Sequence, residues 1–116
     1  MSTPKSTTES RQIFRIDKFV VPNSARQEFM DRIYSINEFL RTLPGFIQDS
    51  ILEQIGGPGE FNFVTIAIWD SPESVETARR LATVRYEEIG FNPQEFLARL
   101  GIKADLANYR QIIPTS

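Results

Sequence analysis

The sequence predicts an α+β fold in which four antiparallel strands carry their helices on one face. The prediction rests first on the segment Phe61 to Asp70, which is rich in β-branched and aromatic residues and mainly apolar on both faces. It rests also on the Gly-Gly-Pro-Gly turn at 56–59, which joins this strand to the preceding one as a hairpin. The predicted order of elements, β-α-β-β-α-(α)-β, is the ferredoxin-like pattern.

The first part of the chain is expected to supply one strand and one long helix. Ile13 to Val21 alternates like a strand and is ended by Pro22. Asn23-Ser24 offers an N-cap, with Gln27 at the spacing of a capping box. The helix is expected to run to about Leu43, before Pro44-Gly45. Its apolar stripe consists of Phe29, Ile33, Ile36, Leu40 and Leu43.

The remaining elements follow from turn and capping residues. Phe46 to Ile55 predicts a more polar strand, the hairpin partner of the segment at 61–70. Asp70-Ser71-Pro72-Glu73 is typical of a helix start, and that helix is expected to end near Ile89. Asn92-Pro93-Gln94-Glu95 repeats this pattern before a short helix that ends at Gly101. A last strand is expected over 104–113, within a single domain at 12–113 that follows a disordered tail at 1–11.

Composition excludes several classes of function. The chain of 116 residues has no cysteine and no histidine, so thiol nucleophiles, Cys-type zinc sites and a histidine ligand for haem are absent. We therefore expect no metal site and no cofactor. The net charge of −2 gives no attraction to nucleic acid, and no apolar run has the length of a membrane helix. The N-terminal segment lacks the apolar stretch of a secretion signal, so we expect a cytoplasmic protein.

A strand that is apolar on both faces needs a cover on each face. One face carries Phe63, Thr65, Ala67 and Trp69 and is expected to lie under the helices. The opposite face carries Val64, Ile66 and Ile68, and one helix layer cannot cover it as well. Large exposed apolar patches are unusual on monomers, so we expect a homodimer with Val64, Ile66 and Ile68 in its interface.

The helix-facing side of this strand is the candidate position of a pocket. Thr65 and Ala67 are small and lie between Phe63 and Trp69, which leaves space under the helices for an apolar pocket. The alternative is that helix side chains such as Tyr86 or Leu40 fill this space. The sequence alone leaves the two alternatives open.

Two polar side chains are candidate catalytic groups. Asp17 is the only acid on the first strand, and burial could raise its pKa into the range of a general base. The favoured alternative is a structural ion pair with Arg15, which shares its face. Tyr86, like Tyr34 and Tyr109, could hydrogen-bond a substrate phenol, although an amphipathic core role is favoured for each of the three.

Three segments resemble the antibiotic biosynthesis monooxygenase-like domain, a member of the dimeric α/β-barrel superfamily. They are Pro-Asn-Ser-Ala at 22–25, Leu-Pro-Gly-Phe at 43–46 and Ile-Trp-Asp-Ser-Pro-Glu-Ser-Val at 68–75, and the resemblance extends over about 12–112. It implies a homodimer and a cofactor-independent monooxygenase that lets a deprotonated aromatic or quinol-type substrate react with dioxygen. It places the pocket between sheet and helices, beside Trp69. The pocket residues expected on these combined grounds are Trp69, Phe63, Thr65, Ala67, Ala78, Tyr34 and Tyr86.

The chain departs from this family at two polar positions. The histidine that many members carry about nine residues after the tryptophan is Ala78 here, and the strand asparagine of haem-degrading members falls near Ile16. Haem degradation is therefore not expected. The alternative to an enzyme is a non-catalytic dimeric module that binds a small ligand and has lost the active-site polar residues of the family.

Overall fold

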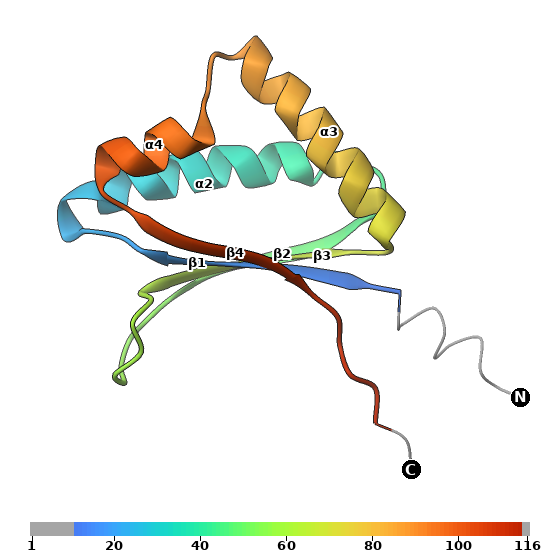
Figure 1. The fold of residues 1–116 in the computed structure, drawn as a ribbon, viewed down its shortest axis with the longest axis horizontal. Coiled ribbons are helices and arrows are strands. Elements are labelled where there is room, and N and C mark those ends of the chain that lie inside the picture. Colours follow the sequence, from blue (N-terminus) through green and yellow to red (C-terminus); the bar gives the residue numbers. More distant parts are fainter. Residues whose placement is uncertain (1–10, 115–116) are drawn as a thin grey trace, which may run out of the picture.

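The computed structural model describes residues 11–114, and in this part of the chain the expected elements occur in the expected order (Figure 1). The expected disordered tail at 1–11 lies outside the described residues, apart from Arg11. The bounds are β1 Ile13–Val20, a 3₁₀ turn η1 Asn23–Ala25, α2 Arg26–Leu40, β2 Phe46–Glu53, β3 Phe63–Trp69, α3 Pro72–Glu88, α4 Pro93–Leu100 and β4 Lys103–Tyr109.

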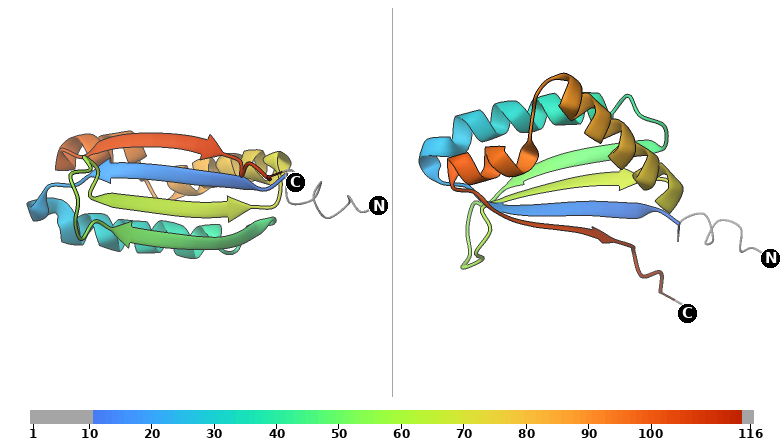
Figure 2. Two further views of the ribbon diagram at one scale, coloured as in Figure 1. Left: turned by 90° about the horizontal axis from the view of Figure 1, so that it is seen from below. Right: turned by 45° about the horizontal axis from the view of Figure 1, so that its top comes forward.

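The four strands form one antiparallel sheet in the order β2-β3-β1-β4. The helices lie together on one face of this sheet (Figure 1), and the view from the other side shows a face without helices (Figure 2, left). The predicted α+β ferredoxin-like fold is therefore confirmed. β1 and β3 are the central strands, so their helix-facing residues determine what lies at the middle of the molecule.

An aromatic cluster fixes α2 on the sheet at one end of the central strands. Phe19 and Phe63 are paired residues of β1 and β3, and Phe29 of α2 packs between them. The Phe29 ring centroid lies 5.0 Å from that of Phe19 and 5.3 Å from that of Phe63. All three side chains are buried. This packing leaves the other half of the helix-facing surface, toward Trp69, to be covered by α3.

The start of α2 differs from the predicted capping box. Residues 23–25 form the 3₁₀ turn instead, and the first turn of α2 has no side-chain cap. The Gln27 side chain donates to Asp31 one turn further on, 2.9 Å away, which leaves it unable to reach back to the cap. The helix also ends at Leu40 rather than near Leu43, in a turn where the Thr42 hydroxyl donates to the carbonyl of Phe39.

The last strand is shorter than predicted because its partner strand ends. The pairing of β1 with β4 begins at Phe14 and Tyr109, so residues 110–113 have no neighbouring strand. The caps of the later helices are confirmed: Ser71 accepts from the Ser74 amide and Asn92 accepts from the Glu95 amide. Among residues 11–114, no helix has both the length and the apolar character needed to cross a membrane.

Candidate functional site

A cavity of about 410 Å³ lies between the sheet and the helices. Its floor is formed by alternate residues of the central strands and β4, because alternate side chains share one face of a strand. Asp17 lies opposite Thr65 and Leu106, and Arg15 lies opposite Ala67 and Asn108. These side chains therefore form a continuous floor that contains the Arg15–Asp17 ion pair, whereas the cavity lining as a whole is mainly apolar.

The roof of the cavity explains why the space stays open. α3 presents the buried residues Ala78 and Ala82 to it, and the floor carries the small residues Thr65 and Ala67. Small residues above and below leave a volume that the flanking side chains do not fill. Of the two alternatives left open by the sequence, the structure thus has a cavity rather than a filled core.

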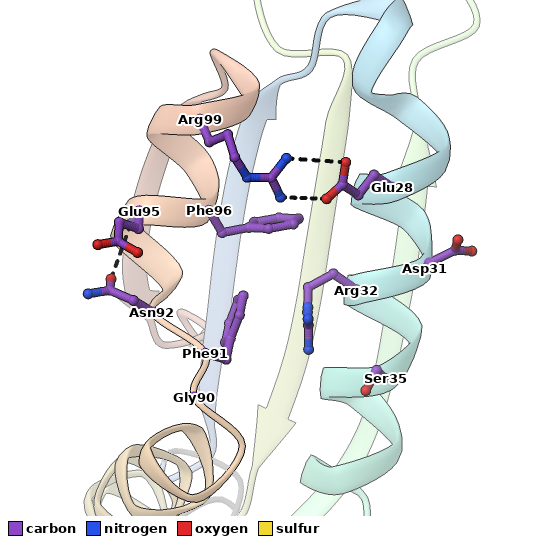
Figure 3. Close-up of a pocket in the computed structure, with 10 residues that line it drawn as sticks. All are labelled: Glu28, Asp31, Arg32, Ser35, Gly90, Phe91, Asn92, Glu95, Phe96 and Arg99. Carbon is purple, nitrogen blue, oxygen red and sulfur yellow. Dashed lines mark hydrogen bonds and ion pairs between the residues drawn. The ribbon is translucent and has the colours of Figure 1, made fainter.

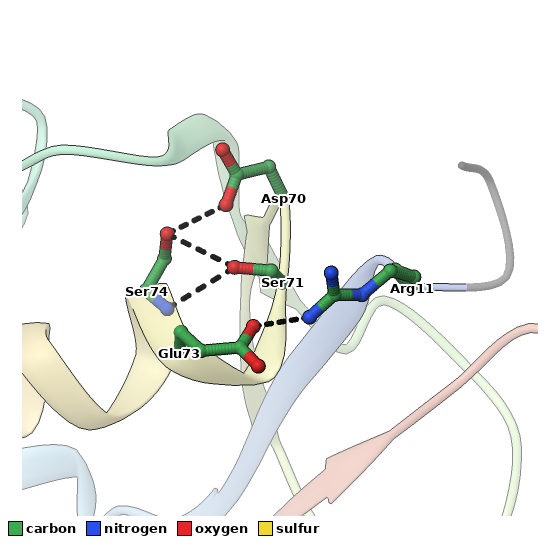
Figure 4. Close-up of polar contacts among 5 residues, drawn as sticks. All are labelled: Arg11, Asp70, Ser71, Glu73 and Ser74. Atoms are coloured by element: carbon green, nitrogen blue, oxygen red, sulfur yellow. Dashed lines mark hydrogen bonds and ion pairs between the residues drawn. The ribbon is translucent and has the colours of Figure 1, made fainter.

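The position of α3 over the cavity is fixed at its first turn (Figure 4). The Ser71 hydroxyl accepts from the Ser74 amide at 3.2 Å, and the Ser74 hydroxyl donates to Asp70 at 2.6 Å. Glu73 pairs with Arg11 at the start of the described chain. The carbonyl of Gly45 accepts from the Asp70 amide, which ties the turn before β2 to the same point. Four residues on from Ser74, Ala78 faces the cavity.

Asp17 is the acidic group of the cavity floor. Its Oδ1 accepts a hydrogen bond from Nε of Arg15 at 2.7 Å, and its side chain is 22% exposed. Burial raises the pKa of Asp17 above its ordinary value, although the neighbouring Arg15 guanidinium acts in the opposite direction. Both interpretations of the sequence therefore coexist: Asp17 is in an ion pair, and it is a carboxylate whose charged form is disfavoured by its surroundings.

Tyr86 closes the cavity near the end of α3. Its ring packs edge-on against Phe91, with centroids 5.3 Å apart. Burial raises the pKa of Tyr86, while the positive charges of Arg32 and Arg15 oppose this and the charge of Asp17 adds to it. The phenol therefore lies among three charged side chains and stays protonated, which makes it a hydrogen-bond donor to a ligand in the cavity.

The structure brings most of the predicted pocket residues together. Trp69, Thr65, Ala67, Ala78 and Tyr86 line the cavity with Asp17. Trp69 is 3% exposed and packs edge-on against Phe46, with centroids 5.4 Å apart.

Two predicted pocket residues lie elsewhere. Tyr34 is 56% exposed, because it lies off the apolar stripe of α2 and faces solvent. Phe63 is buried in the cluster with Phe29, at the end of β3 distant from Trp69. Among residues 11–114, neither belongs to the cavity wall. Tyr109 also lies away from it, since it pairs with Phe14 on the face of the sheet without helices.

Asn37 is a cavity residue that the sequence reasoning missed. It lies on α2, is only 7% exposed, and lines the cavity. Position 37 is four residues after Ile33 and three before Leu40, so it lies on the apolar stripe. A polar residue within that stripe was the signal that could have identified it. Its amide can both donate and accept a hydrogen bond inside the cavity.

The sequence profile of one family matches the larger part of this chain. The antibiotic biosynthesis monooxygenase family matches residues 13–85, which is more than half of the chain and extends from β1 into α3. The chain belongs to the antibiotic biosynthesis monooxygenase family. Among the curated proteins, none matches the chain.

Several solved structures have the same fold as this chain. A conserved protein from Methanosarcina mazei has 20% identity and a TM-score of 0.71, covering 92% of this chain and 99% of its own. SnoaB, a cofactor-independent oxygenase from Streptomyces nogalater, has 23% identity and a TM-score of 0.63, covering 90% and 99%. The haem degrader MhuD from Mycobacterium tuberculosis, solved with two haems in its active site, has 19% identity and a TM-score of 0.64, covering 90% and 99%. At these identities the likeness shows the shared fold.

The cavity does not fit haem held by a histidine ligand. The chain contains no histidine or cysteine, and the family position nine residues after Trp69 presents only the Ala78 methyl group to the cavity. The polar groups that line the cavity include the Asp17 carboxylate paired with Arg15, the Tyr86 phenol, the Asn37 and Asn108 amides and the Arg32 guanidinium. This set is suited to hydrogen-bonding an organic ligand.

Proposed function

We propose that this family member is a cofactor-independent monooxygenase that acts on a small aromatic or quinol-type substrate in the cavity. The observation that carries the proposal is the placement of Asp17, a carboxylate whose pKa burial raises, in a cavity lined by Trp69 and Tyr86. A carboxylate of raised pKa is a better proton acceptor at neutral pH than an exposed one. The fold shared with a cofactor-independent oxygenase also supports the proposal of a monooxygenase without a cofactor.

Each polar group has a separate role in this proposal. Asp17 accepts a proton from the activated methylene or hydroxyl group of the substrate, and Tyr86 and Asn37 hydrogen-bond the oxygen on which negative charge develops. The resulting anion gives its electrons to dioxygen. For an anthrone, the methylene becomes a carbonyl with one oxygen atom, and the other oxygen leaves as water with the two methylene hydrogens. Trp69 and the apolar wall keep bulk water away from the anion.

A second candidate is a non-catalytic module that binds a small aromatic ligand. Ala78 favours it, because this position faces the cavity with a methyl group where many family members have a histidine. The ion pair with Arg15 also favours it, since it stabilises the charged form of Asp17 and so weakens it as a base. The two candidates share the cavity and differ only in turnover.

The test uses dithranol, an anthrone, and the single tryptophan of the chain. Titration is expected to quench Trp69 fluorescence to saturation, and an oxygen electrode is expected to record uptake above that of the buffer alone. The Asp17→Asn variant is expected to keep the quenching and to lose about a hundredfold or more of the uptake, the usual contribution of a general base. Asp31→Asn removes the same charge from an exposed position on α2 and is the matched control.

The outcomes separate the two candidates. Saturable quenching without uptake would favour the binding module, and uptake that Asp17→Asn leaves unchanged would exclude Asp17 as the base. If dithranol and a quinol such as menadiol leave Trp69 fluorescence unchanged in the wild type, both candidates are wrong.

We also propose that the face of the sheet without helices is the interface of a homodimer. This face carries Val64, Ile66 and Ile68, which are only partly buried in one chain. In Figure 1 the turn between β2 and β3 and the segment after β4 extend beyond this face. Each presents a nearly fully exposed isoleucine, Ile55 and Ile112. A second copy would cover this apolar surface. The expected cytoplasmic location stays a prediction.

A further inference from the structure

A second, more open hollow of about 680 Å³ lies between α2 and α4 (Figure 3). Arg32, Phe91 and Phe96 line both this outer groove and the inner cavity. The two spaces therefore meet at these three side chains. A ligand in the inner cavity that extends toward the outer groove would contact them.

Arg32 is unusual among the arginines of residues 11–114. Six others are paired with carboxylates, and the remaining three, Arg80, Arg85 and Arg110, are exposed. Arg32 is half-buried, yet within the described chain it makes no ion pair and no side-chain hydrogen bond to another residue. Its guanidinium carbon lies 4.2 Å from the Phe91 ring centroid, which fixes its position through the ring face.

The expected helix partner of Arg32 is engaged elsewhere. Glu28 precedes Arg32 by four residues, the spacing at which a helix commonly forms an ion pair. Glu28 instead pairs with Arg99 across the groove, as the dashed lines in Figure 3 show. The carboxylate of Asp31 points away from the groove in the same view. The five N–H donors of Arg32 are therefore available to a ligand.

The charged side chains around the inner cavity indicate the class of ligand that Arg32 would bind. Arg15 is paired with Asp17, Arg79 with Glu76 and Arg99 with Glu28, so Arg32 is the one guanidinium along these two spaces that makes no ion pair within residues 11–114. The carboxylates of Asp31 and Glu95 also line the outer groove. Phe91 and Phe96 offer aromatic surface beside it. A guanidinium fork binds carboxylates and similar planar anions through two parallel hydrogen bonds.

We propose that Arg32 is a specificity-determining residue that binds an acidic substituent, such as a carboxylate or sulfonate, of an aromatic ligand whose rings occupy the inner cavity. This inference rests on the ligand-binding cavity of the proposed function and adds a negative charge to the substrate class.

The test compares two probes that differ in one acidic group. These are 8-anilinonaphthalene-1-sulfonate and its uncharged parent, N-phenyl-1-naphthylamine, each detected by energy transfer from Trp69. Arg32→Gln is expected to weaken binding of the sulfonate about tenfold or more, a loss of about 1.4 kcal/mol, and to change binding of the neutral probe by less than about twofold. Arg80→Gln makes the same change of net charge on the exposed face of α3 and is expected to alter neither.

Arg32→Lys provides a second variant, since it keeps the charge and the alkyl stem beside Phe91. It is expected to weaken sulfonate binding by a smaller factor, because an ammonium group lacks the planar fork. The proposal is overturned if Arg32→Gln and Arg32→Lys leave sulfonate binding unchanged, if Arg32→Gln weakens both probes equally, or if Arg80→Gln matches its effect. Neither probe binding to the wild type would instead refute the cavity as a ligand site, and this inference with it.

Discussion

At the scale of single residues, Asp17 couples the free energy of unfolding to pH. Burial holds its pKa in the folded state above the ordinary value of 3.8, so between these two values the folded protein binds more protons than the unfolded chain. The contribution of Asp17 to the free energy of unfolding of the wild type should therefore decrease as the pH rises from 3.8 through the folded pKa, and stay constant above it. Asp17→Asn does not titrate, and we expect its stability relative to the wild type to increase from pH 3.8 upward and then to level off.

Urea unfolding of both proteins over a series of pH values measures this difference. Asp31→Asn corrects for the altered net charge, because Asp31 is exposed. A difference that decreases with rising pH would mean that the ion pair with Arg15 outweighs burial in setting the pKa of Asp17.

Single residues also mark the limit of what the sequence predicts about the site. Strand alternation places Thr65, Ala67 and Trp69 on the cavity floor correctly, because a period of two has only one alternative face. Tyr34 was placed there from its chemistry alone and faces solvent. Asn37 and Arg32 were missed because their roles depend on which side chains surround them, and this requires the three-dimensional arrangement of α2, α3 and α4.

At the scale of elements, local chemistry predicted the helices that carry their own caps. Ser71 and Asn92 begin α3 and α4 as expected, whereas α2 begins without a side-chain cap and its N-cap is Ala25, one residue after the Ser24 of the predicted capping box. The end of β4 is set by the end of its partner β1 rather than by any signal in residues 110–113. Boundaries fixed by local hydrogen bonds are thus visible in the sequence, and those fixed by a partner strand are not.

Gly45 permits the contact between the turn before β2 and the first turn of α3. It has a φ of +82°, and a methyl group there would overlap the Ser74 side chain and lie 2.7 Å from Oδ1 of Asp70. Gly90 has a similar φ of +68° but open space around it. We expect Gly90→Ala to lower the free energy of unfolding by about 1 kcal/mol through backbone strain alone, and Gly45→Ala by roughly 3 kcal/mol because overpacking is added.

Urea unfolding of the two glycine variants isolates the contact from the strain. Equal losses would mean that Ser74 moves aside without cost, and that the first turn of α3 is not held by this packing. A larger loss for Gly45→Ala should be accompanied by weaker dithranol quenching of Trp69, because displacement of α3 moves Ala78 and Tyr86 relative to the cavity floor.

At the scale of the whole molecule, the face of the sheet without helices predicts self-association. Ile66 lies at its centre, paired with Ile16 on one side and Ser50 on the other. A carboxylate buried there in a dimer would lack a partner, so we expect Ile66→Glu to abolish dimerisation.

Light scattering should give twice the chain mass of 13.3 kDa for the wild type and the single mass for the variant. Val84→Glu, the same change of charge at a position 47% exposed on α3, should leave the dimer intact. A wild type that is monomeric at micromolar concentration would contradict the prediction, and the apolar face would then need another cover.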